Sequence, residues 1–144
     1  DESNANGRLI LLPKDSFQTA RFLRRKLKQK YGVKHLGVLI TDSRTMPLRA
    51  GVTGVALGYA GFRGIKDYRG ASDIFGRKFK FSRTDVADGL AAAAVLVMGE
   101  GNEQQPLAII TKAPVKFCDK IRRQELRISI QDDMYRPLFL KLPK

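Results

Sequence analysis

The placement of apolar residues along the first third of the chain predicts a helix. Apolar side chains recur at spacings of three and four residues, at Ala20, Leu23, Leu27 and Tyr31. Asp15 and Gln18 form a capping-box pattern ahead of this stripe, and Gly32 follows it as a C-cap. These signals together predict a helix between Asp15 and Gly32.

A second helix is predicted from about Asp85 to Met98. Its apolar stripe consists of Val86, Leu90, Ala93, Ala94 and Val97. Ser82 or Thr84 is a suitable N-cap, and acidic residues near the start favour the positive end of the helix dipole. Consecutive alanines make the helix thin, so we expect it to pack closely against its neighbours.

Short apolar runs predict strands at residues 8–12, 36–41, 107–111 and 138–140, and alternating charged and aromatic residues predict a half-exposed strand at 78–81. Five of the 13 glycines lie between residues 51 and 64. Such a density favours strands whose backbone is approached closely by another chain or a ligand. Because helices and strands are interspersed without regular βαβ order, we predict an α+β fold with mixed or antiparallel sheets and a few packed helices.

The charge of the chain points to anionic partners. Its 144 residues suit one domain spanning 1–144, and 27 basic against 14 acidic residues give a net charge of +13. Nucleic acid, acidic lipid, and phosphorylated or carboxylated small molecules all fit this excess, as does a missing acidic portion of the same protein. No apolar run approaches the ~20 residues that span a membrane. The single Cys118 excludes an internal disulfide and fits a cytoplasmic location.

Hard oxygen donors occur at three places where strands or helices begin or end. Asp1 and Asn4 precede the first predicted strand, Asp42 and Ser43 follow the second, and Glu100 follows the alanine-rich helix. Carboxylates and hydroxyls suit magnesium or manganese, whereas the single histidine leaves no multi-histidine zinc site. The structural alternative is that Asp42 and Ser43 only form a turn or cap.

Two polar segments are candidates for binding anions. The loop that begins Gly99-Glu100-Gly101 follows a helix and lacks the Gly-Lys-Ser/Thr of a Walker loop, and helix C-termini repel anions, so phosphate there would need an intervening cation. Arg69 and Arg77 lie in a polar connection where guanidinium groups either bind phosphate or carboxylate, or form structural salt bridges.

These pieces, in this order, resemble one family. The segments Ile40–Ser43, Pro47–Gly51, Asp67–Gly70, Gly76-Arg77 and Val86–Gly99 are similar to those of coenzyme F-420 γ-glutamyl ligases, and Asp1–Asn4 resembles that family's Asp-x-x-Asn motif. The resemblance covers residues 1 to about 112. It implies a GTP-dependent ligase that activates an acceptor carboxylate as an acyl phosphate, which the amine of L-glutamate then attacks, and it implies an intertwined homodimer.

The resemblance also assigns roles to individual residues. Asp1 and Asp42 match ligands of a first Mn²⁺ or Mg²⁺ ion, and Ser43 and Glu100 match ligands of a second. The implied GTP contacts are Asn4, Met98, Gly99, Glu100, Gly101, Asn102, Glu103, Gln104 and Gln105. The implied contacts to the anionic acceptor are Arg49, Arg69 and Arg77. No catalytic residue is assigned.

Three departures from the family pattern leave alternatives open. Thr45–Arg49 replaces Gly-Arg-Pro-Trp-Arg, so the acceptor is either the F-420 precursor or a folate-like carboxylate. Glu100 replaces glutamine and adds a negative charge. The family's N-terminal half is absent, so we expect a fragment that supplies half of the active site. The remaining hypotheses are a catalytically silent scaffold and a basic nucleic-acid-binding module, although no nucleic-acid motif supports the latter.

Overall fold

The computed structural model describes residues 5–140 and has the α+β composition that the sequence predicts. Its elements, in chain order, are α1 (Ser16–Tyr31), β1 (Val38–Thr45), β2 (Val52–Ala60), β3 (Ile65–Asp67), β4 (Arg83–Asp85), α2 (Val86–Met98), the 3-10 turn η1 (Ile130–Asp132) and α3 (Arg136–Phe139). Both sheets of the described residues are antiparallel pairs, β1 with β2 and β3 with β4. No helix among these residues is long and apolar enough to cross a membrane.

The two long helices begin and end close to where the sequence predicts. The Asp15 carboxylate caps α1 by accepting a hydrogen bond of 2.9 Å from the Gln18 N–H, and Gly32 ends the helix with a φ of 64°. The N-cap of α2 is Asp85, which accepts from the Asp88 N–H, so the expectation of Ser82 or Thr84 was wrong. An ionised Asp at this position also favours the helix dipole, which a serine or threonine does not.

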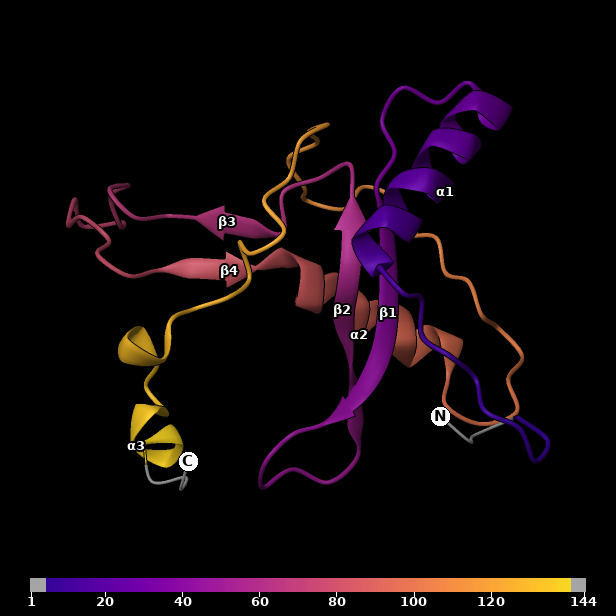
Figure 1. Ribbon diagram of the computed structural model, residues 1–144. Coiled ribbons are helices and arrows are strands. Elements are labelled where there is room, and N and C mark those ends of the chain that lie inside the picture. The colour runs from indigo at the N-terminus through magenta and orange to yellow at the C-terminus, as the bar shows by residue number, and fades with distance from the viewer. Residues whose placement is uncertain (1–4, 141–144) are drawn as a thin grey trace.

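A bulge in β2 lets the two helices pack on opposite faces of the β1–β2 ribbon (Figure 1). Ile40 pairs with Gly58 and Thr41 pairs with Ala56, so Leu57 is an extra residue in β2. Without a bulge, residues 54 and 58 would lie on the same face because side chains alternate along a strand. Instead, Gly54 lies against α2 and Gly58 against the start of α1.

Both of these glycines are places where a helix backbone approaches the strand. A Cβ added at Gly54 would meet the Ala91 carbonyl oxygen and would lie 2.7 Å from Val95 Cγ2. A Cβ at Gly58 would lie 2.6 Å from the Phe17 backbone nitrogen. The close approach that the glycine-rich segment predicts is therefore made by α1 and α2 of the same chain.

Several predicted strands are absent, for a common reason. Residues 8–12 and 107–111 are irregular, and residues 78–81 contribute only an isolated bridge between Ser72 and Lys78. Residues 138–140 lie mostly in α3. Leu11 and Ile109 are more than four-fifths exposed. An apolar run forms a strand only when a neighbouring strand accepts its backbone hydrogen bonds, and the described residues place none beside these runs.

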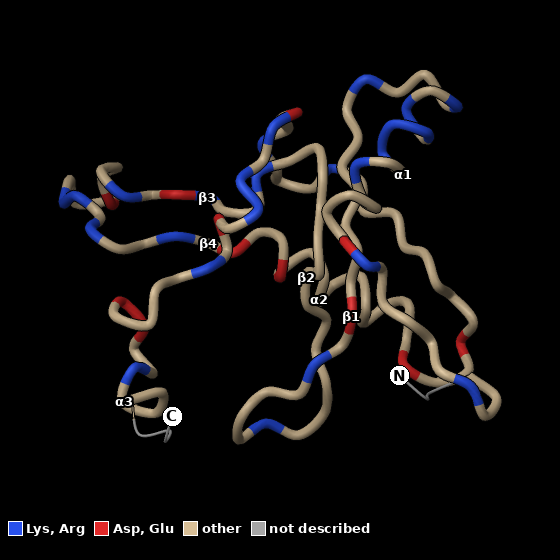
Figure 2. The backbone as a smooth tube through the Cα atoms, viewed as in Figure 1, with Lys and Arg blue, Asp and Glu red and all other residues tan. Residues whose placement is uncertain are grey.

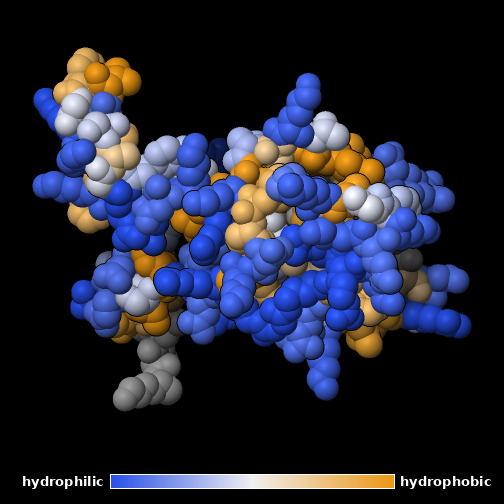
Figure 3. Space-filling model, turned by 90° about the horizontal axis from the view of Figure 1, so that it is seen from above, coloured by the Kyte–Doolittle hydropathy of each residue, from blue (hydrophilic) through white to orange (hydrophobic). Residues whose placement is uncertain are grey.

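The core is small for a chain of this length. It centres on Tyr59, Phe62 and Ala87, with half-buried apolar residues packed around them. The accessible surface is 12145 Å², whereas a compact monomer of this mass exposes about 7,400 Å². Many apolar side chains are exposed, among them Leu11, Leu48 and Ile74, and Figure 3 shows apolar patches among the hydrophilic residues of one face.

Candidate functional site

The sequence-predicted oxygen donors fall on two neighbouring elements and on the undescribed N-terminus. Asp1 and Asn4 lie outside the described residues. Asp42 and Ser43 lie within β1, not after it, because the strand continues to Thr45. Glu100 is exposed in the loop that follows α2.

Strand alternation places Asp42 and Ser43 on opposite faces of β1. Ser43 pairs with Gly54, and the Cβ direction of Gly54 points into α2. Residues that pair across antiparallel strands project from the same face, so Ser43 is on the α2 side and Asp42 is on the other side. The Asp42 carboxylate is half-buried and accepts a hydrogen bond of 2.8 Å from the Ser43 N–H.

The loop after α2 is folded back by Glu103. Its carboxylate accepts a hydrogen bond of 2.8 Å from the Gly101 N–H and packs against Gly99, where a Cβ would clash with it. Gly99 has a φ of 80°, which favours glycine. Asn102 and Gln104 are joined by a side-chain hydrogen bond of 3.1 Å. The loop thus has a defined shape while Glu100 stays exposed.

Helix α2 connects β1 to the loop of residues 99–105, because it packs against the β1–β2 ribbon and the loop follows its last residue. Val95 contacts Gly54, the pairing partner of Ser43, and it lies in the last turn of α2, which is followed by the loop that contains Glu100. The donor chemistry of Ser43, Asp42 and Glu100 suits a hard divalent cation. Within residues 5–140, however, no three His, Cys, Asp or Glu side chains cluster closely enough to hold a metal ion. The described residues therefore form part of a cation site at most.

The three predicted acceptor arginines lie on other parts of the molecule. Arg49 is exposed in the β1–β2 turn. Arg69 and Arg77 belong to the arm formed by β3, β4 and their connection. This arm extends from the start of α2, away from the C-terminal end of that helix (Figures 1 and 2). Arg69 forms an ion pair with Asp67, with 2.6 Å between the guanidinium Nη2 and the carboxylate Oδ2. That hydrogen-bonded guanidinium lowers the pKa of Asp67 to about 2.

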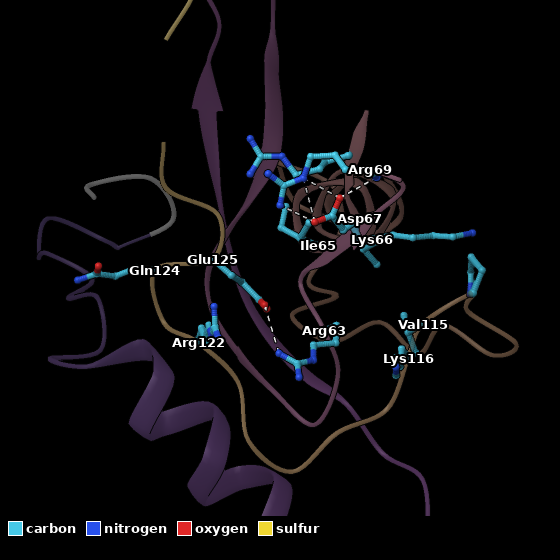
Figure 4. Close-up of a pocket in the computed structure, with 13 residues that line it drawn as sticks. Arg63, Ile65, Lys66, Asp67, Arg69, Val115, Lys116, Arg122, Gln124 and Glu125 are labelled. Carbon is cyan, nitrogen blue, oxygen red and sulfur yellow. Dashed lines mark hydrogen bonds and ion pairs between the residues drawn. The ribbon is translucent and has the colours of Figure 1, made fainter. Parts of the chain in front are cut away.

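A basic pocket lies beside β3 and the start of α2 (Figure 4), and one of its cations, Arg69, was predicted from the sequence as an anion contact. It has a volume of about 930 Å³, and its walls come from side chains in and around β3, from Arg83 and Val86, and from two parts of the C-terminal region, residues 114–116 and Arg122 with Gln124 and Glu125. Six of its lining residues are arginine or lysine and two are acidic. For the C-terminal part of the wall, the available signal was the density of basic residues between 112 and 127, which have no clear periodicity.

One side of this pocket is held by Glu125. Its Oε1 accepts hydrogen bonds from the Tyr59 hydroxyl at 2.6 Å and from the Gly64 N–H at 2.7 Å. Burial, followed by this hydrogen bond and the carboxylate charge, raises the pKa of Tyr59, so the hydroxyl stays protonated and donates. Glu125 thereby fastens the irregular C-terminal region to the end of β2.

Comparison with known proteins identifies the family of the chain. The profile of the F420-0:Gamma-glutamyl ligase family matches residues 1–112. The chain belongs to this family. Coenzyme F420:L-glutamate ligases are similar to it: that of Methanococcus maripaludis strain C7 is 40% identical over 136 residues, and that of Methanopyrus kandleri is 46% identical over 110 residues.

The chain spans about half the length of these ligases. The M. maripaludis alignment covers 94% of this chain and 54% of the relative, and the M. kandleri alignment covers 76% and 43%. The ligase of Methanocaldococcus jannaschii is 37% identical over 136 residues, with the same coverage as the M. maripaludis relative. Alignments of 136 residues extend past residue 112, so the similarity continues further than the sequence motifs suggested.

Proposed function

We propose that this chain is part of a GTP- and divalent-metal-dependent γ-glutamyl ligase that joins L-glutamate to the carboxylate of a coenzyme F-420-type precursor. The family and the names of the relatives support glutamate ligation. The observation that carries the proposal is the position of Ser43 on the α2 face of β1, beside the helix whose C-terminal loop presents Glu100. Both residues lie within the segment that matches the family.

The chemistry of these groups suits phosphate binding through a cation. A bound Mn²⁺ or Mg²⁺ would neutralise phosphate charge at the end of α2, where the helix dipole alone repels anions. The Ser43 hydroxyl and the Glu100 carboxylate would hold one such ion on the α2 side of β1, and the Asp42 carboxylate would hold a second ion together with Asp1. The loop from Met98 to Gln105, kept in shape by Glu103, would position the GTP whose γ-phosphate activates the acceptor carboxylate.

The large exposed surface, which includes many apolar side chains, supports a site that is completed by other protein. The chain exposes about 4,700 Å² more than a compact monomer of its mass, which exceeds what one partner buries in a standard interface of ~800 Å². The relatives are about twice as long as the alignment. We assign that surface to contacts with the remaining portion of a longer protein and with a second copy of it in a homodimer.

The first experiment is calorimetric titration of manganese with GTP into this chain and into a longer protein that contains it. Metal-dependent binding that is tight in the longer protein and weak in the chain is the expected result. Asp42→Asn and Ser43→Ala should each weaken metal-dependent GTP binding, whereas Asp119→Asn, at an exposed carboxylate, should not. Absence of binding by either protein would favour the catalytically silent scaffold.

The acceptor needs a separate test because the β1–β2 turn departs from the family pattern at Thr45–Arg49. Glutamate incorporation should be measured with an F-420-type precursor and with a folate as competing acceptors. Preference for the precursor is expected. A preference for the folate would retain the ligase and replace its substrate.

A further inference from the structure

We propose that the basic pocket is a binding site for a small molecule that carries phosphate or carboxylate groups on a partly apolar body. The pocket stands apart from the loop of residues 99–105, because it lies at the opposite end of α2 (Figure 1). Identifying its ligand with the acceptor of the ligase reaction rests on the proposed function, whereas anion binding itself does not.

The positive charge of the pocket is only partly compensated by its own acidic residues. Its six cations are Arg63, Lys66, Arg69, Arg83, Lys116 and Arg122. Arg69 is paired with Asp67, and Arg63 lies 4.0 Å from Glu125. The other four form no ion pair with any residue that the structure describes. Cations gathered in a concave site without acidic partners are a feature of anion binding.

The two acidic residues in the wall do not offset this excess. Asp67 is held by the Arg69 guanidinium through three hydrogen bonds. Glu125 is turned toward Tyr59 and Gly64, and its side chain is only 11% exposed. Figure 4 shows that its carboxylate points toward Arg63. The exposed arginine and lysine heads therefore determine the potential that a ligand meets.

The backbone of α2 does not supply the attraction. The N–H groups of Val86 and Ala87 donate to the Gly64 carbonyl at 2.8 and 3.1 Å, and the Asp88 N–H donates to Asp85. The first turn of the helix thus has its donors occupied. Binding must depend on the side chains, which makes it testable by substitution.

The size and the apolar part of the wall restrict the ligand class. A volume of about 930 Å³ is in the range of small-molecule sites. Ile65, Val86, Pro114 and Val115 provide an apolar portion of the wall between the cations. A ligand that combines a ring or similar apolar body with anionic groups matches this lining better than a bare inorganic ion.

The test is calorimetric titration of pyrophosphate and, separately, citrate into this chain, at low ionic strength and again near 0.15 M salt. These probes distinguish a phosphate from a carboxylate preference. The test variant is Arg83→Gln with Arg122→Gln, and both side chains are exposed, so the fold should be retained. The control is Arg21→Gln with Arg25→Gln on the exposed side of α1, which removes the same charge. Circular dichroism should be unchanged in both.

The expected result is binding of at least one probe, weakened about tenfold or more in the pocket variant and unchanged in the control. Lys116→Gln alone should give a smaller loss in the same direction. Absence of binding by the unmodified chain, or an equal loss in both double variants, would overturn the proposal, since binding would then be absent or a property of net charge. Failure of manganese-GTP binding would not affect this result, so the two proposals can fail separately.

Discussion

At the scale of single residues, the most consequential contact joins Glu125 to the end of β2. One carboxylate oxygen accepts from the Tyr59 hydroxyl and the Gly64 N–H, and all three groups are largely buried. Hydrogen bonds to a charged group are worth more than neutral ones, and a buried partner left without its bond is costly. No periodicity in residues 121–130 indicates this role, because it depends on partners 61 and 66 residues away in the sequence.

We therefore expect Tyr59→Phe to lower the free energy of unfolding by about 1–2 kcal/mol, because Glu125 loses one donor but keeps Gly64. Glu125→Ala should cost more, since it leaves both donors without a partner. Urea denaturation measures both changes. Tyr135→Phe is the matched control, because Tyr135 is 58% exposed, and its effect should be negligible. Equal effects of Tyr59→Phe and Tyr135→Phe would contradict the assigned role of Glu125.

Asp15 makes the stability of the fold depend on pH. Its cap bond to the Gln18 N–H, followed by its pairing with Arg123 at 2.7 Å, lowers its pKa below the ordinary value of 3.8. The folded state thus favours the charged form, and this stabilisation is present above pH 3.8 and is lost as the pH falls through the lowered pKa.

Asp15→Asn keeps a capping side chain but removes the charge. The variant should be less stable than the parent at pH 7, and the difference should shrink toward pH 2, as the pH falls through the lowered pKa of Asp15. Urea midpoints at the two pH values measure this. A difference that persists at pH 2 would show that the neutral cap, not the charge of Asp15, is what the substitution disturbs.

At the scale of elements, the bulge at Leu57 decides which helix each glycine of β2 faces. Gly54→Ala should lower the free energy of unfolding by about 1–3 kcal/mol or more, because the added methyl meets the Ala91 carbonyl and α2 must move away. Gly58→Ala should do the same through the backbone at Ser16 and Phe17. Thermal unfolding provides the measurement.

The control for these glycines lies on α2. Gly89 is helical and exposed, and a Cβ there meets nothing within 4 Å. Gly89→Ala should raise the free energy of unfolding by up to about 1 kcal/mol through helix propensity. If Gly54→Ala were as well tolerated as Gly89→Ala, the close packing of α2 on the ribbon would be wrong.

At the scale of the whole molecule, the large exposed surface predicts a weak response to denaturant. The slope of the unfolding free energy against denaturant follows the area exposed on unfolding. Given the accessible surface of 12145 Å², this slope should be about 30% smaller than for a compact domain of equal mass. Urea unfolding monitored by circular dichroism measures it. A slope typical of a compact 144-residue domain would mean that the chain closes on itself in solution.

The sequence by itself determined the elements whose signals are local. The caps at Asp15 and Gly32, the alanine-rich helix and the apolar strand at 36–41 all depend on residues within a few positions of one another. The sequence also determined the family, because ordered motifs such as Thr41-Asp42-Ser43 can be identified without any knowledge of the fold.

The tertiary structure alone decided what depends on distant residues. It showed that the apolar runs at 8–12 and 107–111 are not strands, since no described strand lies beside them to accept their hydrogen bonds. It placed Ser43 and Asp42 on opposite faces of β1 and Ser43 near α2. It also gathered cations from positions 63–69, 83, 116 and 122 into one pocket. Local patterns cannot encode such proximity, because it arises only when segments far apart in the chain pack together.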